Sequence, residues 1–75
     1  MPKPLSGKKV VKILCHDFGF SVVSQKGSHI KLQKLEDHHT ITTIVPNHKE
    51  LAMGTLFGVL NLAHIDKKDF LLRML

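Results

Sequence analysis

The feature that most constrains the fold of this chain is a two-residue turn, Gly27-Ser28, between two runs of strand-forming residues. Residues 20–26 contain β-branched and aromatic side chains, and residues 29–35 begin with a strict alternation of polar and apolar residues. A period of two is typical of a strand that has one face in a core. Because a tight glycine-containing turn separates the two runs, the sequence predicts a β-hairpin.

The alternation assigns the side chains of the second strand to two faces. Ile30 and Leu32 are predicted to face the core. The polar residues on the opposite face are His29, Lys31 and Gln33. A titratable ring beside a lysine on an open sheet face is suited to hold and attack a phosphodiester. The alternative is that His29 is an ordinary surface residue at the entrance of a strand, because exposed polar residues are common.

A helix is predicted before the hairpin, over residues 6–18. Ser6 is suited to cap its N-terminus, and Gly19 is suited to end it in a left-handed conformation. The helix has a wet side that carries lysines, Lys8, Lys9 and Lys12. Its apolar residues recur at helical spacing, at Val10, Val11, Ile13, Leu14 and Phe18.

The segment after the hairpin predicts a polar turn at residues 36–39 and a third strand at residues 40–45, closed by Pro46. The pattern does not decide which face of this strand points to the core, because Ile41 and Val45 lie on one face and Ile44 lies on the other. Residues 47–50 are predicted to form a loop. Thr55 is a candidate N-terminal cap for a second helix. Gly58 inside that helix costs stability relative to alanine, which suggests that another segment packs closely there. Asp66 is a candidate N-terminal cap for a short last helix.

The predicted fold class is therefore α+β, with the order α-β-β-β-α and a short C-terminal helix. Two hairpins make a three-stranded antiparallel sheet, and helices must cover one face because a bare three-stranded sheet is barely stable. The other face can stay wet. This is the element order of the double-stranded-RNA-binding domain. The length of 75 residues indicates one small domain, 1–75.

Charge is unevenly placed along the chain. Residues 1–35 hold seven lysines against one acid, whereas residues 36–75 hold three lysines and one arginine against five acids. A basic excess near the hairpin favours a polyanionic partner such as nucleic acid or anionic lipid, although solubility alone can explain it.

A cytoplasmic location is expected from three further features. The single cysteine, Cys15, excludes an internal disulfide and fits a reducing compartment. The first four residues lack the apolar core of a signal peptide, and no apolar run has the length of a membrane span.

The six histidines do not have the spacing of a metal site. His38 and His39 are adjacent, no pair has the helical i, i+4 spacing, and no second cysteine is present. No metal is therefore expected. Glycine-rich nucleotide loops are also absent, and a Ser-His-Asp triad lacks its accompanying motif.

The chemistry that remains is acid–base catalysis by a single histidine beside positive charge. RNA is a suitable substrate for this chemistry. The 2′-hydroxyl of RNA is a built-in nucleophile for the next phosphorus, so the protein needs only to move protons and stabilise the phosphate. Neither a metal nor another cofactor is required. The expected ends are a 2′,3′-cyclic phosphate and a 5′-hydroxyl.

The chain resembles the HicA toxins, which are small mRNA interferases of toxin–antitoxin pairs, over about residues 5–70. The resemblance rests on the following residues, in this order: Leu14 with Gly19-Phe20, Lys26-Gly27-Ser28-His29, Val45-Pro46-Asn47-His48, Gly54-Thr55-Leu56, Leu60, Ala63-His64-Ile65 and Phe70.

The resemblance implies a double-stranded-RNA-binding-like fold, cleavage of mRNA by His29 of the Gly-Ser-His motif, and a HicB-type antitoxin that covers the active face. We expect Lys26 and Lys31 to contact phosphate. Gly27 and Ser28 complete the predicted RNA-binding set.

Two other functions remain open at this stage. One is a non-catalytic RNA-binding module, because the element order suits recognition of A-form RNA by its shape and 2′-hydroxyls. The other is a protein-interaction module whose basic face docks an acidic partner.

Overall fold

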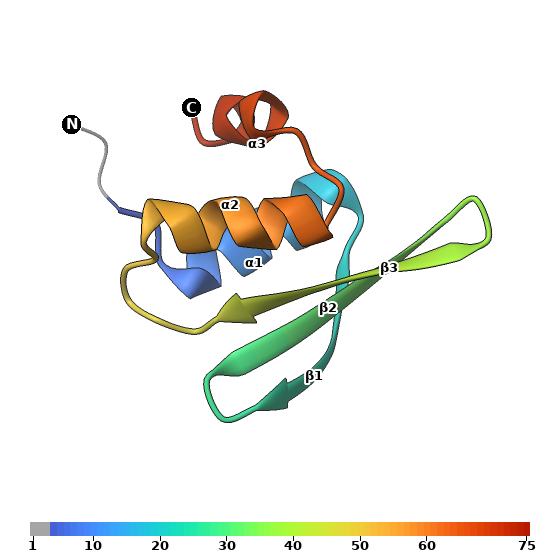
Figure 1. Cartoon of the computed structure of the whole chain (residues 1–75), viewed down its shortest axis with the longest axis horizontal. Coiled ribbons are helices and arrows are strands. Elements are labelled where there is room, and N and C mark those ends of the chain that lie inside the picture. The colour runs from blue at the N-terminus through green and yellow to red at the C-terminus, as the bar shows by residue number, and fades with distance from the viewer. Residues whose placement is uncertain (1–3) are drawn as a thin grey trace.

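The computed structural model describes residues 4–75, which form a three-stranded sheet covered on one face by helices (Figure 1). The elements follow the order predicted from the sequence, with α1 (Gly7–Phe18), β1 (Ser21–Lys26), β2 (His29–Glu36), β3 (His39–Pro46), α2 (Met53–Leu62) and α3 (Lys67–Arg73). The strands are antiparallel in the order β1-β2-β3, so β2 is central. The α+β fold class is therefore confirmed.

Local signals at the ends of α1 were predicted correctly. The Ser6 side chain accepts a hydrogen bond from the backbone N–H of Lys9 at 3.0 Å. Gly19 ends the helix at φ 78°, the left-handed conformation that glycine adopts without steric cost. Cys15 lies on this helix, partly buried against the core.

Both hairpins turn through two residues. The first turn is Gly27-Ser28, as predicted. The second is Asp37-His38, and both of its residues have positive φ, at 50° and 64°. Two consecutive residues of this kind match the right-handed twist of the flanking strands, so β2 and β3 pair right up to the turn. The expected turn over residues 36–39 was too long by one residue at each end.

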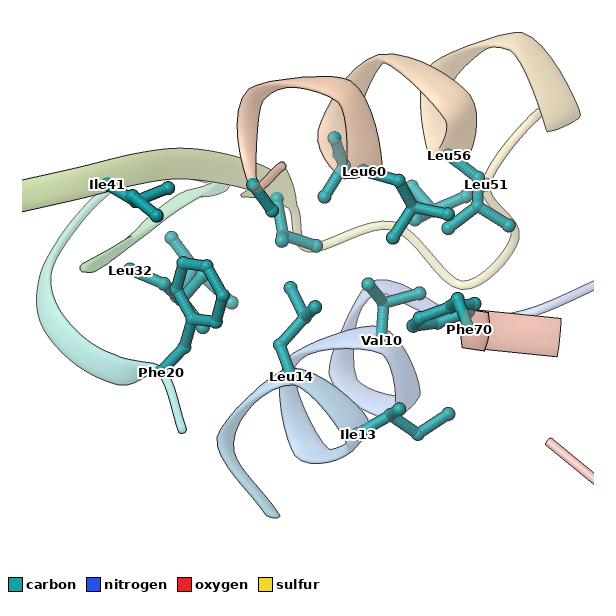
Figure 2. Close-up of a cluster of buried hydrophobic side chains, with 14 residues drawn as sticks. Val10, Ile13, Leu14, Phe20, Leu32, Ile41, Leu51, Leu56, Leu60 and Phe70 are labelled. Carbon is teal, nitrogen blue, oxygen red and sulfur yellow. The ribbon is translucent and has the colours of Figure 1, made fainter. Parts of the chain in front are cut away.

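The core lies between the covered face of the sheet and the helices (Figure 2). Val10 and Leu14 of α1 are fully buried, as is Leu32 of β2. Phe70 of α3 is also fully buried, and its ring stacks on Phe18 with 6.2 Å between centroids. The last helix therefore contributes directly to the core of this small domain.

The inward face of β3 is settled by packing. Ile41, Thr43 and Val45 are buried, and Ile44 points to the opposite face, where its side chain is 44% exposed. Thr43 is buried with its hydroxyl donating a hydrogen bond of 2.8 Å to the carbonyl oxygen of Val59 in α2. A polar residue can occupy this position because it has a partner.

Two expectations about α2 were wrong. Thr55 does not cap the helix, which begins at Met53 after Ala52 and has no side-chain cap. The start is instead set by buried Leu51, whose backbone N–H donates to the carbonyl oxygen of Leu5 at 2.8 Å. Gly58 is not a close-packing position, because a Cβ built there would meet nothing within 4 Å.

Candidate functional site

The open face of the sheet carries His29, which begins the central strand beside the first turn. Its register partners are Lys26 on β1 and Pro46 on β3. Directly opposed residues of antiparallel strands point to the same face of a sheet. His29 and Lys26 therefore share the open face, and Lys31 joins them because it lies two residues along the same strand.

A β-bulge in β1 puts Val22 on the opposite face of the sheet from Ser24 and Lys26. The register shifts between Val22, which pairs with Leu32, and Ser24, which pairs with Lys31. In a regular strand two residues of the same parity face the same side, but the extra residue of a bulge reverses this relation. Val22 thus belongs to the side of the buried Leu32, whereas Ser24 and Lys26 belong to the open face.

Five residues of this face line a shallow hollow of about 450 Å³, which we call the His29 hollow. Two lysines give it a positive charge, and none of its lining residues is acidic. All of its lining residues are exposed, so ligand charges enter without the large cost of burying them first. The lining consists of Ser24, Lys26, His29, Lys31 and Ile44.

The backbone around His29 is held by the turn and by the loop after β3. The backbone N–H of Asn47 donates to the carbonyl oxygen of Ser28 at 2.6 Å, and the Gln25 side chain donates to the carbonyl oxygen of Gly27 at 3.2 Å. Gly27 has φ +60°, which only glycine adopts readily. The site residue therefore sits on a braced hairpin rather than a free loop.

The imidazole of His29 is exposed, and no side-chain hydrogen bond or ion pair within residues 4–75 engages it. Both ring nitrogens are therefore accessible to a ligand in the hollow. An imidazole can accept a proton at one nitrogen and donate one from the other near neutral pH.

Not every predicted RNA-contact residue lines the hollow. Lys26 and Lys31 do, together with His29, whereas Gly27 and Ser28 form the adjoining turn. Sequence reasoning missed Ser24 and Ile44. The bulge hides the parity of Ser24, and the mixed apolar pattern of β3 leaves the direction of Ile44 open.

The other histidines are dispersed over the molecule. His38 lies in the second turn, His39 begins β3, His48 lies in the loop after β3, His64 follows α2, and His16 contacts Asp17 at 3.0 Å on α1. Across the described part of the chain, no three His, Cys, Asp or Glu side chains gather in the manner of a metal site.

None of the helices in residues 4–75 combines the length and the apolar character that crossing a membrane requires. The described residues form a helical side and an open sheet face (Figure 1). The open face presents His29 together with Lys26 and Lys31.

Comparison with known protein families identifies a match to most of the chain. The family described as HicA toxin of bacterial toxin-antitoxin matches residues 7–65, which include α1, the whole sheet and α2. Searches of curated proteins and of solved structures give no significant match. The match spans most of the chain and includes the braced turn with His29, and the protein therefore belongs to the HicA family of toxins from bacterial toxin–antitoxin pairs.

Proposed function

We propose that this toxin is a metal-independent endoribonuclease that cleaves mRNA in the cytoplasm, with His29 as its catalytic residue. The observation that carries the proposal is the cross-strand pairing of His29 with Lys26, with Lys31 beside them in the same hollow. A proton-transfer group is thus flanked by two cations on a face open to a polymer.

The proposed reaction is an internal phosphoryl transfer within the RNA. The 2′-oxygen loses its proton and forms a bond to the adjacent phosphorus, and the bond from phosphorus to the 5′-oxygen breaks. The leaving 5′-oxygen gains a proton. The products are a 2′,3′-cyclic phosphate and a 5′-hydroxyl end, and no cofactor enters the balance. His29 exchanges one of these protons with the substrate.

Lys26 and Lys31 are proposed to bind the phosphate under attack. Negative charge accumulates on the non-bridging oxygens as the fifth bond to phosphorus forms, and fixed cations favour that state. Both lysines lie on the same face as His29, one on the neighbouring strand and one on its own. The ammonium groups are therefore available on two sides of the imidazole.

The turn residues Gly27 and Ser28 are proposed to contact the RNA backbone beside the cleaved bond. A Cβ built on Gly27 would meet nothing within 4 Å, so this part of the turn is open to an approaching strand. The Ser28 hydroxyl is suited to donate to a phosphate oxygen.

The antitoxin is proposed to be of the HicB type and to cover this same face. Two features support the placement. Ile44 of β3 is exposed on the open face. Leu35 of β2 points to the same face and is 74% exposed, so this face carries apolar as well as basic side chains. Apolar surface rimmed by charge is typical of protein interaction sites.

The test is incubation of a defined single-stranded RNA with the wild-type protein and with His29→Ala, both in EDTA, with the ends identified by mass. We expect the wild type alone to cut and to leave cyclic phosphate. His16→Ala is the matched control, because His16 is an exposed histidine on α1, away from the sheet.

Equal cleavage by His29→Ala and the wild type would reject His29 as the catalytic residue. Intact RNA in every sample, with binding that falls steeply with salt, would identify a non-catalytic RNA-binding module instead. Cleavage by the wild type in a parallel sample without EDTA, but not in EDTA, would reject the metal-independent route.

A further inference from the structure

A second basic hollow lies at the start of α1 beside the loop that follows β3. It has a volume of about 280 Å³ and is lined by Ser6, Lys8, Asn47, His48 and Lys49, which we call the α1 hollow. Lys8 and Lys49 are exposed and have no ion-pair partner within residues 4–75, and no acid lines the hollow. This is unpaired positive charge gathered from two segments distant in the sequence.

The backbone that carries these side chains is fixed by hydrogen bonds. The N–H of Gly7 donates to the carbonyl oxygen of His48 at 2.8 Å, and the N–H of Lys9 donates to the Ser6 hydroxyl at 3.0 Å. These first backbone donors of the helix are therefore already occupied. An anion in this hollow would be held by the lysine and histidine side chains.

The two hollows lie next to each other along the chain at the end of β3, because Ile44 lines the His29 hollow and Asn47 lines the α1 hollow. Pro46 pairs with His29, and the next residue, Asn47, donates its N–H to the carbonyl oxygen of Ser28 at 2.6 Å. Lys49 follows two residues later, a step of at most about 7 Å along the chain. A nucleic-acid strand advances by roughly 3.4 Å per nucleotide in a helical stack, so a few nucleotides span this interval.

We propose that Lys8, His48 and Lys49 form a second phosphate-binding subsite for the RNA strand that is cleaved at His29. The strand would pass from the open face around the edge formed by Pro46 and Asn47. Ammonium groups bind phosphate as point charges, and an imidazole N–H adds a directed donor. The proposal rests on the proposed function in taking RNA as the substrate.

The subsite would serve positioning rather than chemistry. Phosphate contacts set the register of a nucleic acid on a protein without reading its bases. A strand held at two points, at the His29 hollow and at the α1 hollow, has its scissile bond placed over the imidazole. A very short RNA that reaches only the first hollow would lack this second hold.

The test measures binding in the His29→Ala background, so that RNA stays intact. Labelled single strands, a trinucleotide and a dodecanucleotide, are titrated with this protein by fluorescence anisotropy at several salt concentrations. The variant is Lys8→Gln with Lys49→Gln. The matched control, Lys9→Gln with Lys68→Gln, removes the same charge from exposed lysines outside the hollow. Circular dichroism melts establish that both variants are folded.

For the dodecanucleotide we expect the slope of log affinity against log salt to become shallower by about 0.7 in the variant, the value for one single-strand phosphate contact. The trinucleotide should bind the variant and the control alike. The subsite is wrong if the variant and the control have equal slopes with the long RNA, or if the trinucleotide loses as much affinity as the dodecanucleotide.

Failure of the subsite and failure of the proposed nuclease are distinguishable in the same samples. Length-dependent loss of binding in the variant, together with intact RNA after incubation with the His29-containing wild type, supports the subsite and rejects the nuclease. Cleavage by the wild type with equal slopes for variant and control rejects the subsite alone. Absence of RNA binding even at low salt rejects both.

Discussion

The hydroxyl of Thr43 donates a hydrogen bond to the backbone carbonyl oxygen of Val59, and this bond joins the central part of β3 to α2. Thr43 is the one buried polar residue within residues 4–75, and its side chain has no exposure to solvent. The same carbonyl oxygen also accepts the N–H of Ala63 at 3.0 Å. The acceptor therefore keeps a partner when the hydroxyl is removed.

Thr43→Val is expected to lower the free energy of unfolding by about 1 kcal/mol, because it removes one hydrogen bond and nearly conserves shape. Thr43→Ala should cost more, since it also leaves a cavity beside α2. Urea denaturation of the two variants measures both values. A Thr43→Val protein as stable as the wild type would show that the bond contributes nothing net.

Gly7→Ala is expected to destabilise the fold by about 1–3 kcal/mol, the usual range for overpacking. A Cβ at residue 7 would overlap the carbonyl oxygen of Pro46, which is backbone and cannot swing away. Gly58→Ala is the matched control, because a Cβ there has open space within a helix. It should stabilise the protein by up to about 1 kcal/mol. Thermal melts that shift in the same direction for both would contradict this assignment.

Lys31→Gln is expected to reduce RNA cleavage severalfold, whereas Lys34→Gln should leave it near the wild-type level. Both lysines are on β2, but Lys34 belongs to the other face, where its ammonium lies 5.8 Å from the centre of the Phe20 ring. Each substitution removes one positive charge from the same strand, so a difference in cleavage between the two variants reports the face of the sheet on which the charge lies. Initial cleavage rates at fixed ionic strength provide the measurement. Equal losses of cleavage rate in the two variants would mean that the rate depends on the net charge of the protein and not on a lysine in the His29 hollow.

Asp66→Ala is expected to cost about 1 kcal/mol of stability, since Asp66 caps α3 by accepting the N–H of Lys68 at 2.7 Å. The loss should propagate to the core, because α3 carries the fully buried Phe70. Thr55→Ala provides the comparison. It lies inside α2 and caps nothing, so alanine should stabilise the helix by a few tenths of a kcal/mol. A lower denaturant midpoint for Thr55→Ala would contradict this expectation and would support a capping role for Thr55.

Much of the architecture follows from signals confined to a few neighbouring residues. The Ser6 and Asp66 caps, the left-handed Gly19 and the Gly27-Ser28 turn all involve hydrogen bonds or dihedral preferences over two to four positions. Neighbouring residues are covalently held together, so their preferences persist in the fold. The common face of His29 and Lys31 is likewise a property of one strand with a period of two.

Other features depend on segments that meet only in the folded chain. The start of α2 is an example, because Leu51 binds the backbone of Leu5 and thereby overrides the apparent cap at Thr55. The inward face of β3 is another, since Thr43 could be buried only with a partner on α2. Neither preference is visible in the local pattern.

The candidate site also combines features that follow from the local sequence with features that depend on the tertiary structure. By itself the sequence determined that a turn precedes His29 and that Lys31 shares its face, because alternation along one strand is a local property. Lys26 shares this face through its pairing with His29 across the turn. Only the tertiary structure decided that Val22 does not, since the bulge at Val22/Ser24 reverses the parity of β1. It alone also brought Asn47 to Ser28 and so placed Lys49 near the hairpin. Cross-strand register and contacts between distant segments arise from packing the whole chain, which no short stretch of sequence encodes.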